Sequence, residues 1–250
     1  MKDMKKILKI VVLPLIFSLI AISCEIDNYE GPDAKITGRF LDSKTGELVG
    51  TDITNGNSIG AYELGWDSES RQNWVIKNNG EYTNNLVFAS TYRLEFSNCN
   101  FFPFTVENFV IKKGENEHDF TVTPFIRVTN PAITYDAATK TVKATFGLEA
   151  GGDNIKLNEI RLFAFTDHWV GNYVKFAISG SDCYKRASAN QVGSTIGTDT
   201  YTLTMNVDAN SALFKYSRNY YFRIGALATV SGVGTVRHNY SPLVVLPIER

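Results

Sequence analysis

The residues with the clearest potential for binding chemistry are aromatic side chains in polar loops. Trp66 and Trp74 flank the polar segment 67–73, and Trp169 and Tyr173 lie in a second loop of mixed polar and aromatic residues. An indole or phenol ring can stack on the apolar face of a sugar, while neighbouring amide and charged groups bond the hydroxyls. We therefore name these four aromatic residues as candidate ligand contacts. Burial in the core is the alternative for each tryptophan, because a β-sandwich commonly packs one there.

Motifs of covalent catalysis are not found in the sequence. Residues 193–197 read Gly-Ser-Thr-Ile-Gly, which places the serine one position too early for a nucleophile motif, and 232–234 is only a fragment of a dinucleotide loop. Asp167 and His168 would point to opposite faces of a strand, so we interpret them as a polar pair at the end of a loop. We therefore expect a non-enzymatic protein with no catalytic residues and no cofactor.

Potential metal ligands are few and dispersed. The three histidines lie far apart and show none of the spacings of zinc-binding motifs. The acidic alternation at 115–119 has no second group of oxygen ligands, and we interpret it as a solvated strand edge. Cys99 and Cys183 are far apart, without a Cys-x-x-Cys motif, so they predict free, partly buried thiols and no metal site.

The first 23 residues have the layout of an export signal. Four lysines precede an apolar run at 10–22. A membrane-spanning helix needs about 20 residues, so this run is too short to be one. Ser23 and Cys24 follow, and the segment Ala21-Ile-Ser-Cys24 resembles the cleavage site of a bacterial lipoprotein. We expect Cys24 to become the acylated N-terminus, held by lipid in the outer membrane. The alternative is an ordinary secretory signal with an incidental cysteine.

Residues 24–33 form an acidic segment that predicts a tether. It resembles the export signal that sends lipoproteins of Bacteroidota to the outer membrane surface, and a plain solvated tether is the alternative. The whole chain has a formal net charge of −1, and without residues 1–23, which hold four lysines and one aspartate, this becomes −4. Such a balance gives no basic surface for nucleic acid, so none is expected as a partner.

Composition and periodicity favour an all-β protein. The chain has 250 residues, of which 44% are hydrophobic and 12% aromatic, and few segments show helical spacing. Short alternating runs recur about every ten residues, which is typical of β-sandwiches. We predict two tandem β-sandwich domains, at 34–125 and 126–250, with a connection that ends at Pro131.

Individual elements support this division. Residues 34–42 alternate between apolar and polar side chains, and Asn79-Gly80 is a strong hairpin signal. In the second domain, residues 214–226 carry a large or apolar side chain at almost every second position. This repeat resembles the fibronectin type III pattern, in which Tyr220 would be the corner tyrosine whose hydroxyl caps the backbone upstream.

Three segments carry a resemblance to a known domain. Residues 36–47, 79–82 and 92–94 resemble a prealbumin-like or carboxypeptidase-regulatory-like sandwich. The chain after the signal is similar to a family of Bacteroidota surface lipoproteins, in which such a domain precedes a fibronectin-like one. The segments that carry this closer likeness are 61–66, 72–74 and 121–125.

The resemblance implies a setting that composition and spacing do not. Members of that family are typically associated with nutrient uptake of the Sus (starch-utilisation) kind, beside an outer-membrane transporter and its lid lipoprotein. We therefore expect a surface lipoprotein that captures oligosaccharide. A structural or adhesin-like subunit with a protein partner is one alternative, and capture of peptide is another. Exposed rings on one surface would favour glycan, whereas buried rings with an apolar patch or an open strand edge would favour a structural role.

Overall fold

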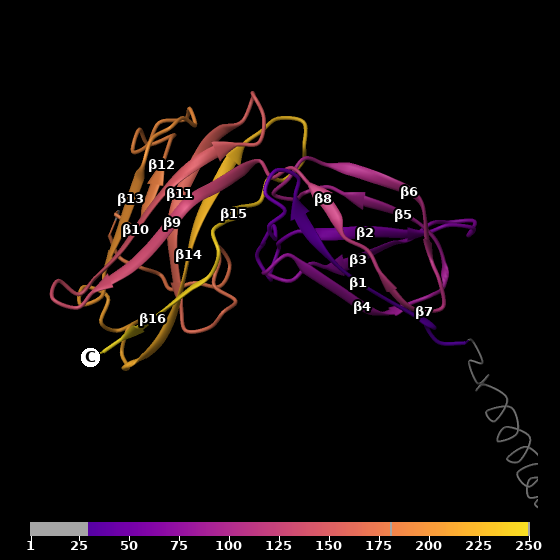
Figure 1. Cartoon of the computed structure of the whole chain (residues 1–250), viewed down its shortest axis with the longest axis horizontal. Helices are drawn as coiled ribbons and strands as arrows, with labels where there is room; N and C mark the ends of the chain where they lie inside the picture. Colours follow the sequence, from indigo (N-terminus) through magenta and orange to yellow (C-terminus); the bar gives the residue numbers. More distant parts are fainter. Residues whose placement is uncertain (1–29, 181, 250) are drawn as a thin grey trace, which may run out of the picture. The chain divides into compact units, whose positions relative to one another are not determined.

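A computed structural model of the chain describes residues 30–180 and 182–249, and its regular elements there are all β-strands. Pro32–Arg250 form one compact unit. The strands build two tandem β-sandwiches, which confirms the predicted fold class (Figure 1). The described residues include no helix long and apolar enough to cross a membrane. The predicted signal segment and Cys24 lie outside the described residues.

The first sandwich has two four-stranded sheets. One sheet has the order β4-β1-β7, with β8 also paired to β1, and the other has the order β3-β2-β5-β6. The strands are β1 (Ala34–Asp42), β2 (Ser58–Glu63), β3 (Arg71–Val75), β4 (Glu81–Val87), β5 (Ser90–Phe96), β6 (Phe104–Ile111), β7 (Gly114–Glu117) and β8 (Phe120–Val122).

Aromatic side chains fill the core of this sandwich. The predicted alternation along β1 turns Ile36 and Phe40 inward, and both are fully buried. The rings that lie within 6 Å of the Phe40 ring, centroid to centroid, are those of Tyr82, Phe96, Phe101 and Phe120. Phe40 is therefore the centre of the packing between the two sheets.

The predicted hairpin at Asn79-Gly80 is a tight turn between strands of different sheets. The backbone N–H of Gly80 donates to the carbonyl of Lys77 at 2.9 Å, and Gly80 has a φ of +92° that favours glycine. After one bridge between Ile76 and Tyr82, however, β3 and β4 separate into the two sheets. The turn signal was correct, but the two-stranded ribbon that usually accompanies it is not formed.

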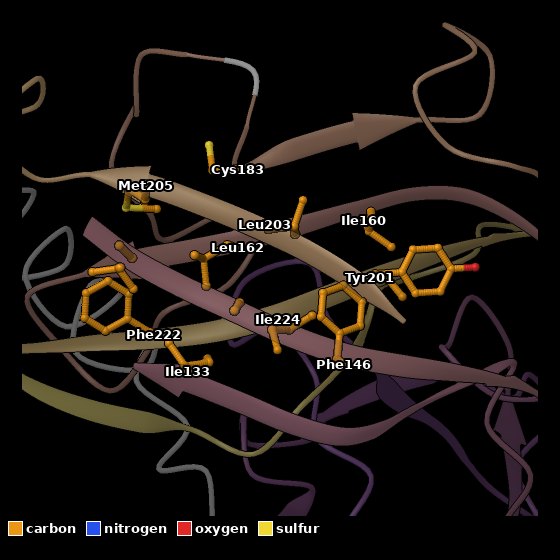
Figure 2. Packing of buried hydrophobic residues seen from close by; sticks show 14 of the residues in the cluster. Ile133, Phe146, Ile160, Leu162, Cys183, Tyr201, Leu203, Met205, Phe222 and Ile224 are labelled. Carbon is orange, nitrogen blue, oxygen red and sulfur yellow. The ribbon is translucent and has the colours of Figure 1, made fainter. Parts of the chain in front are cut away.

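The second sandwich packs a three-stranded sheet against a five-stranded one. Their orders are β13-β10-β9 and β12-β11-β14-β15, with β16 also paired to β14. The strands are β9 (Ile126–Asp136), β10 (Thr141–Ala150), β11 (Lys156–Phe165), β12 (Tyr184–Arg186), β13 (Tyr201–Asn206), β14 (Arg218–Thr229), β15 (Asn239–Tyr240) and β16 (Val244–Ile248). Figure 2 shows side chains from both sheets meeting in the core, among them Phe146, Leu162, Leu203 and Phe222.

Tyr220 on β14 confirms the predicted tyrosine corner. Its hydroxyl donates to the carbonyl of Tyr216 at 2.9 Å and accepts a hydrogen bond from the Tyr216 N–H at 3.3 Å. The ring is buried against Phe214, with centroids 4.9 Å apart. One side chain thus fixes the approach to β14 and fills the core.

Pro131 does not end the connection between the sandwiches, which corrects the prediction. It lies inside β9, where the pairing with β10 shifts register between Thr145 and Gly147. Strand β9 pairs with β10 alone, so a proline without an N–H is tolerated at this irregular edge. The segment between β8 and β9 is residues 123–125.

Candidate functional site

The four predicted aromatic contacts occupy different environments. Trp74 is only 4% exposed, its ring meets the edge of Tyr92, and its Nε1–H donates to Gln72 Oε1 at 3.3 Å. A buried indole offers no face to a sugar, so the interpretation of Trp74 as a ligand contact was wrong. Its inward position on β3 makes it part of the core of the first sandwich.

Trp66 is well exposed but lies far from the second aromatic loop. It belongs to the β2–β3 loop. The Leu64 N–H of this loop donates to the carbonyl of Thr91, which places the loop at the end of the sandwich where β1 begins. The other end of β1 is Asp42, which bonds Arg127 of the second sandwich. The nine residues of β1 span about 25 Å, so the two aromatic loops do not share one surface.

Trp169 and Tyr173 lie together in the loop that follows β11, residues 166–176. Tyr173 is 48% exposed and Trp169 is half-buried. The exposed imidazole of His168 lies over the Trp169 indole, with ring centroids 4.1 Å apart. This loop therefore carries three ring side chains within six residues, those of His168, Trp169 and Tyr173.

The side chains of Asp167 and His168 meet, contrary to prediction. They occupy a turn, where adjacent side chains need not point to opposite faces, and Asp167 Oδ1 lies 2.5 Å from His168 Nδ1. The expected position at the end of a loop was correct. The pair is exposed and fixes the imidazole beside the Trp169 ring.

Residues of the first sandwich fix this loop through hydrogen bonds to its backbone. Asn78 donates its side-chain N–H to the carbonyl of His168 at 2.6 Å, and the backbone N–H of Asn172 donates to Asp52 Oδ1 at 2.6 Å. A Cβ added to Gly171 would lie 2.2 Å from that same carboxylate oxygen, so only glycine allows this approach. The loop is thereby set in one shape before any ligand arrives.

Next to the loop lies a polar cluster of the buried Asp52 and Arg223 with the partly buried Tyr240. The Tyr240 hydroxyl donates to Asp52 Oδ2 at 2.5 Å, and the Arg223 guanidinium lies 4.2 Å from the centre of the Tyr240 ring. Burial, and then the charge of Asp52, hold the pKa of Tyr240 well above its usual range. Arg223 donates to the carbonyls of Thr51, Asn78 and Ser241, at 3.1 to 3.3 Å.

Arg223 remains a cation in this cluster. Burial lowers the pKa of Arg223 to about 10, against the attraction of Asp52. Two of its three carbonyl partners belong to the first sandwich, so the guanidinium joins the two domains. The sequence contains one indication of this role. The even-numbered residues of β14 form the core, and Arg223 is a charged residue at one of the odd-numbered positions, which alternate with them.

A second ionic contact between the sandwiches involves Asp42. Its carboxylate accepts two hydrogen bonds from the Arg127 guanidinium, at 2.6 and 2.7 Å, and Arg127 also bonds Glu149 at 3.0 Å. Burial alone would raise the pKa of Asp42, but the hydrogen bonds from Arg127 and Lys44 outweigh it and hold the pKa below its usual range.

The Asp42→Asn variant is expected to lose pH-dependent stability. At pH 7 its free energy of unfolding should fall by about 1.5–3 kcal/mol, the range for a hydrogen bond to a charged group. A carboxyl whose pKa is lowered on folding stabilises above its unfolded value and ceases to do so as the pH falls through its folded value. The difference from wild type should therefore shrink below about pH 4. Urea titrations at pH 7 and pH 3 measure it, and an equal difference at both would contradict the assignment.

The other groups in the described part of the chain that could form a site are metal ligands, thiols and hollows. Among the described residues, no three His, Cys, Asp or Glu side chains gather closely enough to hold a metal ion. Cys99 and Cys183 are free thiols, as predicted, but they are buried and not partly buried. Burial raises the pKa of Cys99 to about 12. A hollow of about 410 Å³ beside Phe102 and Val230 includes no residue of the 166–176 loop.

Comparison with known proteins identifies the family. Residues 34–123 match the model described as "Protein of unknown function (DUF3823) N-terminal domain", and residues 126–245 match "Domain of unknown function (DUF3823_C)". The chain belongs to the DUF3823 family. The first match covers the strands of the first sandwich, and the second covers those of the second sandwich as far as the start of β16.

Solved structures of similar proteins share this DUF3823 architecture. A Bacteroides uniformis protein, whose name proposes carbohydrate binding, is 51% identical, with a TM-score of 0.82 over 87% of this chain and 100% of its own. DUF3823 proteins from Bacteroides ovatus and Parabacteroides merdae are 20% and 18% identical, with TM-scores of 0.67 and 0.66. They cover 86% and 87% of this chain, and 98% and 100% of their own. A search of curated proteins finds no match.

Proposed function

We propose that this chain binds oligosaccharide, without catalysis, through the loop at 166–176. The observation that carries the proposal is the fixed geometry of that loop, in which Trp169 and Tyr173 are presented on a backbone held by Asp52 and Asn78. The Bacteroides uniformis relative supports it, because half of its residues are identical and its name proposes carbohydrate binding.

The loop combines the two kinds of group that a sugar needs. The rings of Trp169 and Tyr173 supply apolar faces for the C–H side of a pyranose. The side chains of Asp167, Asn172 and Lys175 lie in the same loop and can exchange hydrogen bonds with hydroxyls. Because the loop is already bonded to the first sandwich, little conformational freedom is lost on binding. An open surface of this kind suits an extended chain of sugars.

We further propose that the protein acts at the outer membrane surface, acylated at Cys24. Its place would be that of an accessory to a Sus-type uptake system, beside the transporter and its lid lipoprotein. The signal-like segment and its cysteine support the anchor. Anchoring would raise the local concentration of captured oligosaccharide close to the importer.

Trp169→Ala is expected to abolish binding of oligosaccharide. Removing the indole takes away the stacking face and leaves the hydrogen bonds of Asp52 and Asn78 to the backbone intact. The measurement is retardation of the protein in native gels that contain a panel of soluble polysaccharides. Wild type should be retarded by at least one polysaccharide, and the variant should migrate as it does in an empty gel.

A second variant tests the location of the site. Trp66→Ala changes an indole at the other end of the first sandwich and should be retarded like wild type. Loss of retardation in Trp66→Ala alone would contradict the assignment to the 166–176 loop. Wild type that is retarded by no polysaccharide would contradict glycan binding and favour a structural or peptide-binding role.

A further inference from the structure

One end of the first sandwich, here called the proximal end, is where the described chain enters β1. Ala34 pairs with Val87 at the end of β4 and with Gly114 at the start of β7. On the other sheet, Ser90 at the start of β5 pairs with Ile111 at the end of β6. The loops at the proximal end are therefore 64–70, 88–89 and 112–113, together with the residues that precede β1.

Large apolar side chains are exposed at this end. Trp66 is 66% exposed, Leu86 74%, Phe88 40% and Val110 61%. They come from three separate segments: the β2–β3 loop, the end of β4 with the turn that follows it, and the end of β6. The opposite end of the same sandwich is held against the second sandwich by Asp52 and its partners. The other exposed large apolar side chains of this sandwich, Leu48 and Val75, lie toward the opposite end. The greater number at the proximal end indicates a surface that is covered by something else.

The length of the chain before β1 identifies the surface that lies within reach. Cys24 precedes Ala34 by ten residues, which even fully extended span at most about 35 Å. A lipid attached to Cys24 therefore keeps the bilayer within that distance of the proximal end. Tryptophan is favoured at the boundary between lipid and water because its ring is apolar and its N–H is polar.

We propose that the proximal end lies against the membrane, with Trp66, Leu86, Phe88 and Val110 inserted at the lipid–water boundary. This inference rests on the proposed acylation of Cys24. It assigns the two aromatic loops to different tasks: Trp66 contacts lipid, and Trp169 and Tyr173, beyond the other end of β1, face away from the bilayer.

The contact is apolar rather than electrostatic. Charges at the proximal end are mixed: Lys113 lies 3.7 Å from Asp33, and Lys35 lies 3.3 Å from Glu115. A surface without excess positive charge gains little from anionic lipid. The contact is therefore expected on membranes without net charge.

The test uses the acylated full chain in vesicles of phosphatidylcholine and phosphatidylethanolamine. One set of vesicles carries bromine on the acyl chains, which quenches tryptophan fluorescence at close range, and the other set does not. Wild type is expected to lose emission in the brominated vesicles. The Trp66→Phe variant should lose no emission in the brominated vesicles. The Trp169→Phe variant should be quenched like wild type, since Trp66 is unchanged there.

Flotation of the vesicles separates this inference from the anchor itself. Protein that floats with the vesicles but is not quenched by bromine would overturn the membrane contact and leave the anchor intact. Quenching that persists in Trp66→Phe would also overturn it, because another tryptophan would then face the lipid. Protein that does not float would refute the anchor, and with it the premise of the inference.

Discussion

Replacing Arg223 by methionine is expected to lower the free energy of unfolding by about 3–5 kcal/mol, as for removal of one partner from a buried ionic cluster. Methionine keeps much of the volume but donates no hydrogen bonds. The carbonyls of Thr51, Asn78 and Ser241 would lose the buried donor that they share, and Asp52 would lose the cation near it.

The same substitution should also separate the unfolding of the two sandwiches. Arg223 on β14 bonds two carbonyls of the first sandwich, so its loss weakens the coupling between the domains. Urea unfolding followed by circular dichroism should change from one transition towards two.

The matched control for Arg223 is an arginine at the surface. Arg39 pairs with Asp119 at 2.6 Å, but its side chain is half exposed, and such pairs add little to stability. Arg39→Met should therefore keep the midpoint and the single transition of wild type. Equal effects of the two substitutions would show that burial of the Arg223 cluster is not what couples the domains.

Phe40→Ala is expected to cost about 3–5 kcal/mol of unfolding free energy, the range for loss of a fully buried phenylalanine. Phe40 has no exposed surface and touches four other rings from both sheets of the first sandwich. Alanine would leave a cavity at the one point where these rings converge, and the rigid aromatic side chains around it cannot easily fill the space.

Trp74 offers a probe for this substitution. It lies in the same core, so its emission should shift to longer wavelength at a lower urea concentration than in wild type. Val75→Ala is the control, because Val75 is 58% exposed on the neighbouring position of β3 and should shift the transition far less. A Phe40→Ala protein as stable as that control would contradict the central role of Phe40.

The strands could be predicted because local pattern determines them. Alternation along β1 and β14 reflects one face turned to a core, and Tyr220 was recognised because its partner lies only four residues upstream. Asn79-Gly80 was likewise recognised as a turn. The sheets that the turn connects depend on the packing of distant strands, and the turn residues do not encode that choice.

The candidate site could be predicted only in part, because its residues meet through contacts distant in the sequence. Trp169 and Tyr173 were identified as one loop, but Asp52 lies 120 residues from the Asn172 backbone that it binds. Trp74 and Trp66 look alike in sequence, since both border a polar loop. Only the register of β3, which turns Trp74 inward, separates a core residue from an exposed one.

Both faces of strand β14 are buried around Arg223. Tyr220 and Phe222 point into the core of the second sandwich, and Arg223 is also buried and bonds the first sandwich. Cut from its neighbour, the second sandwich would expose a guanidinium shaped for carbonyls that are no longer there. These domains are therefore poor candidates for shuffling into other proteins singly. A fusion or truncation that keeps one should keep its companion, and evolution would be expected to pass them on as a pair.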